Sequence, residues 1–180
     1  MAVVMVAISL AFGALWGAFW AHVRDQGRIP GLPNSSKGKE TGIALFGLPM
    51  AALALGFGWI EAALIWVGMA GGWSLGHMGG MGLRFAPSRN GLSVPAAYAA
   101  MIGTGALVTL APAGVLAWHG AWIAAAVVLL AGALKAATYE AGFLIRGLTD
   151  RPPHATWLGA LGHGAIAYAV TAAAVVLVGA

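Results

Sequence analysis

The chain has 180 residues, of which 61% are hydrophobic and only 8% are charged. A water-soluble domain carries about 25% charged residues, so the composition predicts an integral membrane protein with a single domain, 1–180. We attribute the formal net charge of +4 to membrane-flanking loops and not to nucleic-acid binding. The absence of cysteine excludes disulfides and thiolate metal sites.

Six apolar stretches have the length that crosses a bilayer, which is about 20 residues when tilt is allowed. They must be helices, because backbone polar groups cannot be left open to lipid. The sequence therefore predicts an all-α protein with six transmembrane helices, at 2–22, 43–58, 59–83, 94–118, 121–147 and 156–179. The first stretch begins at Met1 without the basic residues of a signal peptide, and we interpret it as a membrane helix.

Basic residues orient these helices. The loops 23–42, 84–93 and 146–155 contain Lys or Arg, whereas the turns near 57–59 and 118–121 contain neither. Because cytoplasmic loops attract basic residues, the three basic loops are predicted to be cytoplasmic. Both termini are then on the non-cytoplasmic side of a bacterial-type inner (plasma) membrane, in a multi-pass topology.

Segments 41–83 and 104–146 look like two copies of one helix pair. The residues that recur include Thr41-Gly42 with Thr104-Gly105, Pro49 with Pro112, and Trp59-Ile60 with Trp122-Ile123. A repeated apolar hairpin indicates a stacked or ring-like arrangement. Helices 2–22 and 156–179 fit the same charge pattern, so we predict that they form a third pair, with three hairpins around a pseudo-threefold axis.

Small residues occur throughout the predicted spans, among them Gly13, Gly68, Gly72 and Gly132. Small residues allow helix backbones to approach closely in lipid. We interpret nearly all of these glycines as packing residues.

Polar side chains within spans usually face the interior of a helix bundle. His77, Glu140 and His163 are predicted at one depth on three helices, near their cytoplasmic ends. Lys135 is nearer to mid-membrane, four residues from Tyr139 on the same helix face. These five residues are predicted to line a path for a small solute.

Each of these residues has a structural alternative. Either histidine can simply hydrogen-bond a neighbouring carbonyl in a packed interior. Lys135 and Glu140 can form an ion pair, although five residues apart they lie on different faces of a helix. Because an imidazole titrates near neutral pH, His77 as a lining residue predicts pH-sensitive flux.

Tryptophan recurs every seven residues on one face of the third helix, at positions 59, 66 and 73. We predict that Trp66 and Trp73 form the walls of a constriction, with contact to lipid or to another subunit as the alternative. Trp59 and Glu61 are predicted at an outer vestibule. The alternatives are an interfacial anchor for Trp59 and a headgroup position for Glu61.

Sequence motifs of nucleotide-binding proteins, zinc proteases and serine hydrolases are absent. The sequence therefore predicts no enzyme, no cofactor and no metal site. A membrane-embedded haem or metal protein that uses His77 and His163 is kept as the third alternative.

The segment 139–157 runs from Tyr139 through Glu140 to Arg151-Pro152-Pro153 and Trp157. It resembles the helix–loop–helix junction of the six-helix urea/amide channel family, with the acetate/succinate transporter family as a second candidate. The resemblance implies a hexamer around a lipid plug with one pore per protomer, lined by Glu140 and the deep tryptophans. The Asn-Pro-Ala-Pro type of start found in the acetate family is missing from the first helix.

Together these features predict a small-solute channel or facilitator for a small weak acid, anion or amide. Its expected partners are the lipid bilayer, the solute, and further copies of the chain or a membrane complex, with no nucleic acid. The second alternative is a structural or accessory subunit of a larger membrane protein complex, since the chain lacks large soluble loops.

Overall fold

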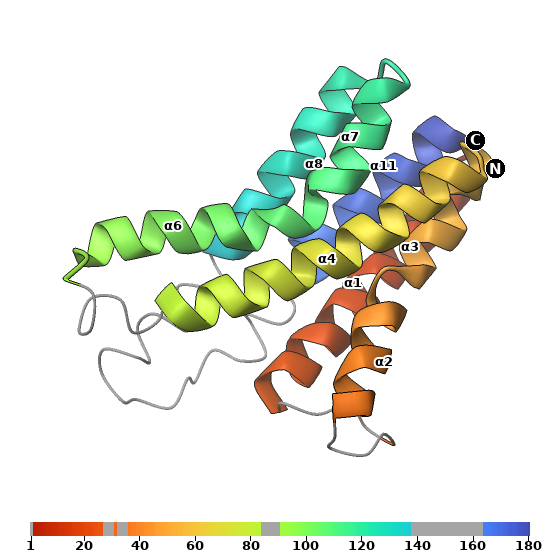
Figure 1. Cartoon of the computed structure of the whole chain (residues 1–180). Coiled ribbons are helices and arrows are strands. Elements are labelled where there is room, and N and C mark those ends of the chain that lie inside the picture. The colour runs from red at the N-terminus through yellow and green to blue at the C-terminus, as the bar shows by residue number, and fades with distance from the viewer. Residues whose placement is uncertain (1, 27–30, 32–35, 84–90, 138–163) are drawn as a thin grey trace.

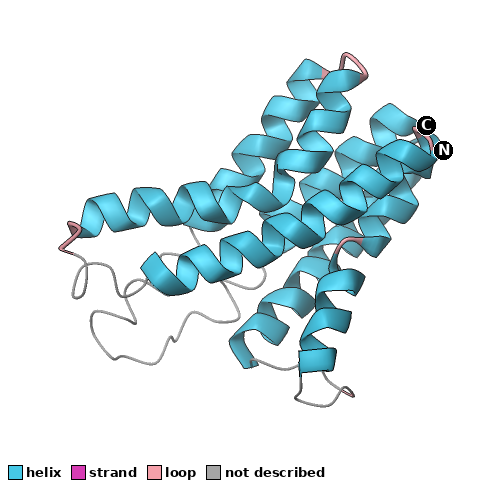
Figure 2. Cartoon of the chain, viewed as in Figure 1, coloured by secondary structure: helices cyan, strands magenta, loops and turns pink. Residues whose placement is uncertain are grey.

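The computed structural model describes residues 2–26, 31, 36–83, 91–137 and 164–180. Over this part of the chain the fold is helical and contains no strand (Figure 1, Figure 2). The elements are α1 (Ala2–Gln26), α2 (Ser36–Phe46), α3 (Leu48–Leu53), η1 (Ala54–Gly56), α4 (Trp59–Leu83), α6 (Val94–Ala106), η2 (Leu107–Thr109), α7 (Leu110–Trp118), α8 (Trp122–Lys135), η4 (Gly164–Ala169) and α11 (Val170–Gly179). Elements η1 and η2 are 3₁₀ turns, and η4 is a π-helix.

Two helical stretches are long and apolar enough to cross a membrane. They are Val3–Trp20 within α1 and Val94–Trp118, which runs through α6, η2 and α7. Shorter apolar stretches occur at Glu40–Gly56, Trp122–Lys135 and Ala167–Gly179. The all-α prediction is therefore confirmed over the described residues, with two candidate membrane spans.

The helix predicted over 43–58 begins earlier and is interrupted. It starts at Ser36 and breaks at Gly47, and α3 then begins at Leu48. Pro49 has no N–H and its ring collides with the carbonyl group four residues earlier, so a continuous helix would be strained there. Within the first turn of a new helix, the same proline removes no hydrogen bond.

The span predicted over 94–118 has the expected ends but is broken inside. Helix α6 ends at Ala106, η2 follows, and α7 leaves the break in a clearly different direction (Figure 1). Pro112 is the third residue of α7, where again no intrahelical donor is needed. Each break therefore comes just before the proline that the two predicted copies share.

Two turns follow η1 and α7. Gly58 has a φ of 139° and Gly120 a φ of 79°, which other residues rarely adopt. The turn predicted at Gly56-Phe57-Gly58 is found, and α4 and α8 begin at the equivalent residues Trp59 and Trp122.

Glycines on one side of α4 contact the interrupted stretch Val94–Trp118. A Cβ atom at Gly72 would overlap the Leu107 carbonyl, and one at Gly76 would lie 2.7 Å from the Thr104 carbonyl oxygen. Their spacing of four residues places them on one helix face. The backbone of α4 thus packs directly on the break, in agreement with the packing role expected for these glycines.

Helix α1 lies along η4 and α11, and the two chain ends are neighbours (Figure 1). Gly13 marks the closest approach, because a Cβ there would overlap the backbone of Tyr168 and Ala169. The other end of α11 packs on the turn after η1, where a Cβ at Gly56 would overlap the Gly179 carbonyl. Both chain ends and this turn therefore share one end of the molecule.

Candidate functional site

The two helix breaks are the candidate site, because backbone carbonyl groups there accept hydrogen bonds from side chains of other helices. At the first break, the indole N–H of Trp66 donates to the Ala44 carbonyl and that of Trp16 donates to the Phe46 carbonyl, at 2.5 and 3.1 Å. Gly47 allows this approach, since a Cβ there would overlap the Trp66 carbonyl. Indole groups from α1 and α4 thus cap the end of α2.

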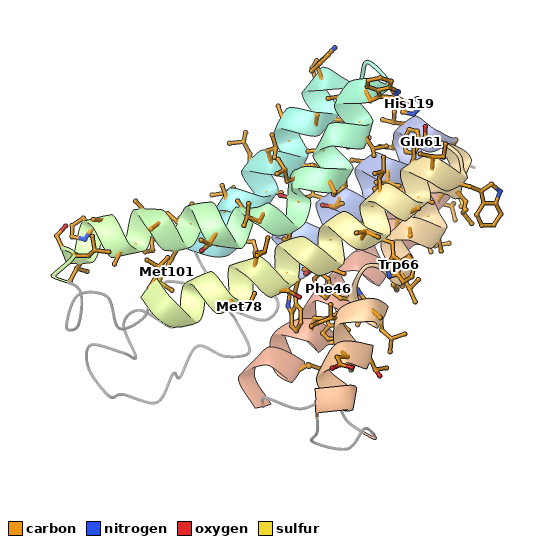
Figure 3. All side chains as sticks on the ribbon, in the orientation of Figure 1. Phe46, Glu61, Trp66, Met78, Met101 and His119 are labelled. Atoms are coloured by element: carbon orange, nitrogen blue, oxygen red, sulfur yellow. The ribbon has the colours of Figure 1, made fainter. Side chains whose placement is uncertain are left out.

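An aromatic cluster surrounds this first break. Phe46 is fully buried, and its ring lies 5.2 Å from Trp20 and Trp73 and 5.5 Å from Tyr168, measured between centroids. The Trp20 ring meets Trp73 edge-on at 5.4 Å, an arrangement favoured by the ring quadrupoles. Figure 3 shows Phe46 and Trp66 near the junction of α2 with α4. The region is a closely packed aromatic core.

Trp20 has a buried indole N–H with no hydrogen-bond partner among the described residues. Its edge-to-face contacts with four rings, Trp16, Phe19, Phe46 and Trp73, surround the indole with aromatic side chains.

At the second break the capping group is the amine of a lysine. The Nζ atom of Lys135 donates to the Gly105 carbonyl at 3.2 Å, and only 3% of the Lys135 surface is exposed. Gly105 is in the last turn of α6, where the helix dipole favours a cation. The buried amine of Lys135 is thus held at the end of α6.

Threonine hydroxyls complete the second break. Thr109 is buried and donates to the Ala106 carbonyl at 3.0 Å, and Thr104 donates to the Met101 carbonyl at 3.2 Å. A Cβ at Gly132 would overlap the Thr109 hydroxyl, so α8 packs directly on the break. The second break is therefore lined by polar groups, unlike the aromatic first break.

The predicted lining residues are only partly within the described residues. Tyr139, Glu140 and His163 lie outside them, and so does the predicted polar level that joins Glu140 and His163 to His77. His77 itself is in α4, but its side chain is also outside the described residues. Among the five predicted polar lining residues, Lys135 is the one whose side chain lies within the described residues.

The deep tryptophans have packing partners within the protein. Trp66 caps α2 and Trp73 stacks on Phe46, as described above. Both side chains keep some exposed surface. Their predicted role as constriction walls is compatible with these contacts and stays a prediction.

A contact between Glu61 and His119 joins the two turns. Glu61, in the first turn of α4, lies 3.5 Å from the Nε2 atom of His119, measured from Oε1. The two side chains are at the same end of the molecule in Figure 3. Trp59 is 81% exposed, so its side chain does not pack over this pair.

His119 lies in the predicted turn near 118–121 but was not predicted as a site residue. The repeat could have indicated this residue, because it aligns the turn of His119 with the turn of Phe57. Glu61 comes shortly after that second turn. Two turns at one end of a helix bundle bring such residues close together, even when the sequence separates them widely.

Among the described residues, no group of three or more His, Asp or Glu side chains could hold a metal ion. The haem alternative depends on His77 and His163, whose side chains are outside this part of the chain. The chain matches no protein-family model, no curated protein and no solved structure.

Proposed function

We propose that this chain is a six-span integral membrane protein that lets a small weak acid or anion, or a small amide, cross the membrane. The observation that carries the proposal is the pair of broken helices at corresponding positions of two predicted repeats. In membrane proteins, irregular backbone is tolerated where protein buries it or where it lines a cavity. Helices interrupted at matching positions of two repeats are typical of transporter binding sites.

The proposed architecture is three helix pairs around a pseudo-threefold axis. Two pairs come from the repeat, and the contact of α1 with η4 and α11 supports the third. Both chain ends and the turn after η1 lie at one end of the molecule. This supports an even number of spans, because an even number returns the chain to the side on which it began. With the basic loops in the cytoplasm, both termini are outside the inner membrane.

Lys135 is the proposed centre of the solute path. A charge near the centre of a bilayer costs several kcal/mol, roughly 3 on insertion scales. Capping a backbone carbonyl does not require a charge, because the indoles of the first break perform that task without one. We assign the amine of Lys135 to the solute as well, and an ammonium group favours a small anion over a neutral amide.

Other predicted residues complete the proposed path. Glu140, His77, His163 and Tyr139 would form its inner part, with His77 making flux sensitive to pH. Trp66 and Trp73 would narrow it, and Glu61 would face its outer vestibule. A homo-oligomer is the proposed assembly, with one path in each protomer.

Flux into proteoliposomes tests the function. Acetate and urea serve as anionic and neutral probes, and Lys135→Met is compared with Leu134→Ala, whose residue is exposed on the same helix. We expect wild-type protein to conduct acetate, Lys135→Met to lose most of this flux, and Leu134→Ala to retain it. Absence of flux with either probe in the wild type would favour the accessory-subunit alternative.

A further inference from the structure

Phe57 lies where three parts of the helix bundle meet at the outer end. Its ring packs against both large core clusters, one around α1 and α4 and the other between α7 and α8. A Cβ at Gly179 would be 3.0 Å from Phe57 Cε2, so the ring also covers the end of α11. The Phe57 ring therefore contacts both core clusters and the end of α11 at one place.

His119 holds this ring from the second turn. The His119 and Phe57 rings are 4.8 Å apart, and the imidazole also faces the Glu61 carboxylate at 3.5 Å. Gly58 makes room for that carboxylate, because a Cβ there would be 2.8 Å from Glu61 Oε2. Three side chains from two helix pairs thus form one connected contact across the outer end.

This contact is more easily broken than the packing deeper in the molecule. The side chains of His119 and Glu61 are 33% and 22% exposed, and each belongs to a turn or to the first turn of a helix. Partly exposed ion pairs contribute only about 0–1 kcal/mol. Separation of the two turns would therefore cost little, whereas Lys135 is held inside packed helices.

We propose that Phe57, Glu61 and His119 form an outer gate for the solute path, closed in this structure by the Glu61–His119 pair over the Phe57 ring. The inference rests on the proposed transport function. When the turns separate, the carboxylate and imidazole turn toward water and the Phe57 ring leaves the gap between helix pairs. The gate acts at the outer end, at a distance along the bundle from the break at Lys135.

The natural absence of cysteine allows a direct test. The variant Glu61→Cys/His119→Cys is reconstituted and treated with a short bis-methanethiosulfonate reagent, which links two thiols and is removed by reductant. A direct disulfide is unsuitable because it needs Cα atoms about 4.4–6.8 Å apart, whereas these side chains meet at their tips. The control is Ile60→Cys/Ile123→Cys, at equivalent and largely exposed positions of α4 and α8.

We expect the Glu61/His119 pair to cross-link within one chain, with acetate flux blocked by the reagent and restored by reductant. The control pair should react without loss of flux, and Phe57→Ala should conduct faster than wild type. Efficient cross-linking with undiminished flux would overturn the gate while leaving the transport proposal intact, and failure to cross-link would overturn the juxtaposition itself. Wild-type protein without flux would overturn the transport function and the gate with it.

Discussion

The two helix breaks differ in the side chains that satisfy their carbonyl groups. The first is capped by the neutral indoles of Trp66 and Trp16 and is enclosed by aromatic rings. The second is capped by the ammonium group of Lys135 and is bordered by threonine hydroxyls. Both follow the same rule, that backbone carbonyls in an apolar environment need a donor.

We propose that this difference separates a structural break from one that binds the solute. Indole donors satisfy carbonyl groups while their rings add packing, so they stabilise the fold without introducing charge. An ammonium group performs the same capping but adds a large desolvation cost. A lysine is therefore energetically the more costly way to cap a carbonyl group, and for this reason we propose that Lys135 binds the solute. The following variants test this distinction.

Phe46→Ala should have the largest effect on stability, because the fully buried ring contacts three other aromatic residues at the first break. The loss is expected to be about 3 kcal/mol, as for large cavities in protein interiors. Unfolding in mixed micelles by SDS titration measures it. Leu45→Ala, at an exposed neighbouring position, is the control, and equal losses for both would contradict an aromatic core at this break.

Gly72→Ala should destabilise the second break, because its Cβ would overlap the Leu107 carbonyl. We expect a loss of about 2 kcal/mol, since backbone has to shift to make room. The adjacent Gly71 has open space at the Cβ position, so Gly71→Ala should be neutral or stabilising by about 0.5–1 kcal/mol. Thermal unfolding in detergent compares the two variants. A Gly71→Ala protein that is less stable than Gly72→Ala would refute this packing.

Trp66→Phe should have a smaller effect, because it removes the donor to Ala44 but keeps most of the ring. One lost hydrogen bond corresponds to about 1 kcal/mol, measurable as a lower midpoint in the same unfolding assay. Acetate flux per folded protein should remain close to wild type, because a phenyl ring keeps most of the wall that Trp66 is proposed to give the path. A Trp59→Phe control, at an exposed position, should change neither quantity; a large flux defect in Trp66→Phe alone would mean that the solute depends on the indole N–H at the first break, contrary to the proposal.

Composition and turn residues were sufficient to predict much of the fold. The abundance of apolar residues predicts helices, and Gly58 with the equivalent turn at Gly120 marks where the helix pairs reverse direction. The predicted ends of the span at 94–118 are also correct. Ser93 and Pro95 favour the start of a helix at one end, and Gly120 forms the turn beyond the other end.

The breaks inside the second and fourth helices were not predicted, although Pro49 and Pro112 were noted as shared residues. Apolar character continues through both breaks, and proline can be accommodated in a kinked helix when neighbours satisfy the freed groups. Whether a helix bends or stops depends on those neighbours. Trp66 and Lys135 act on carbonyls 22 and 30 residues away in sequence, so their roles become visible only when the helices are placed in space.

The most direct test compares stability and flux for one pair of variants, Lys135→Met and Trp66→Phe. Lys135→Met should unfold at or above the wild-type midpoint, because loss of a capping bond is offset by removal of a buried charge. Its acetate flux should fall about tenfold or more, equivalent to about 1.4 kcal/mol, whereas Trp66→Phe should lose stability and keep its flux. A Lys135→Met protein destabilised by about 3–5 kcal/mol, as expected for half of a structural ion pair, with unchanged flux per folded protein, would contradict the account.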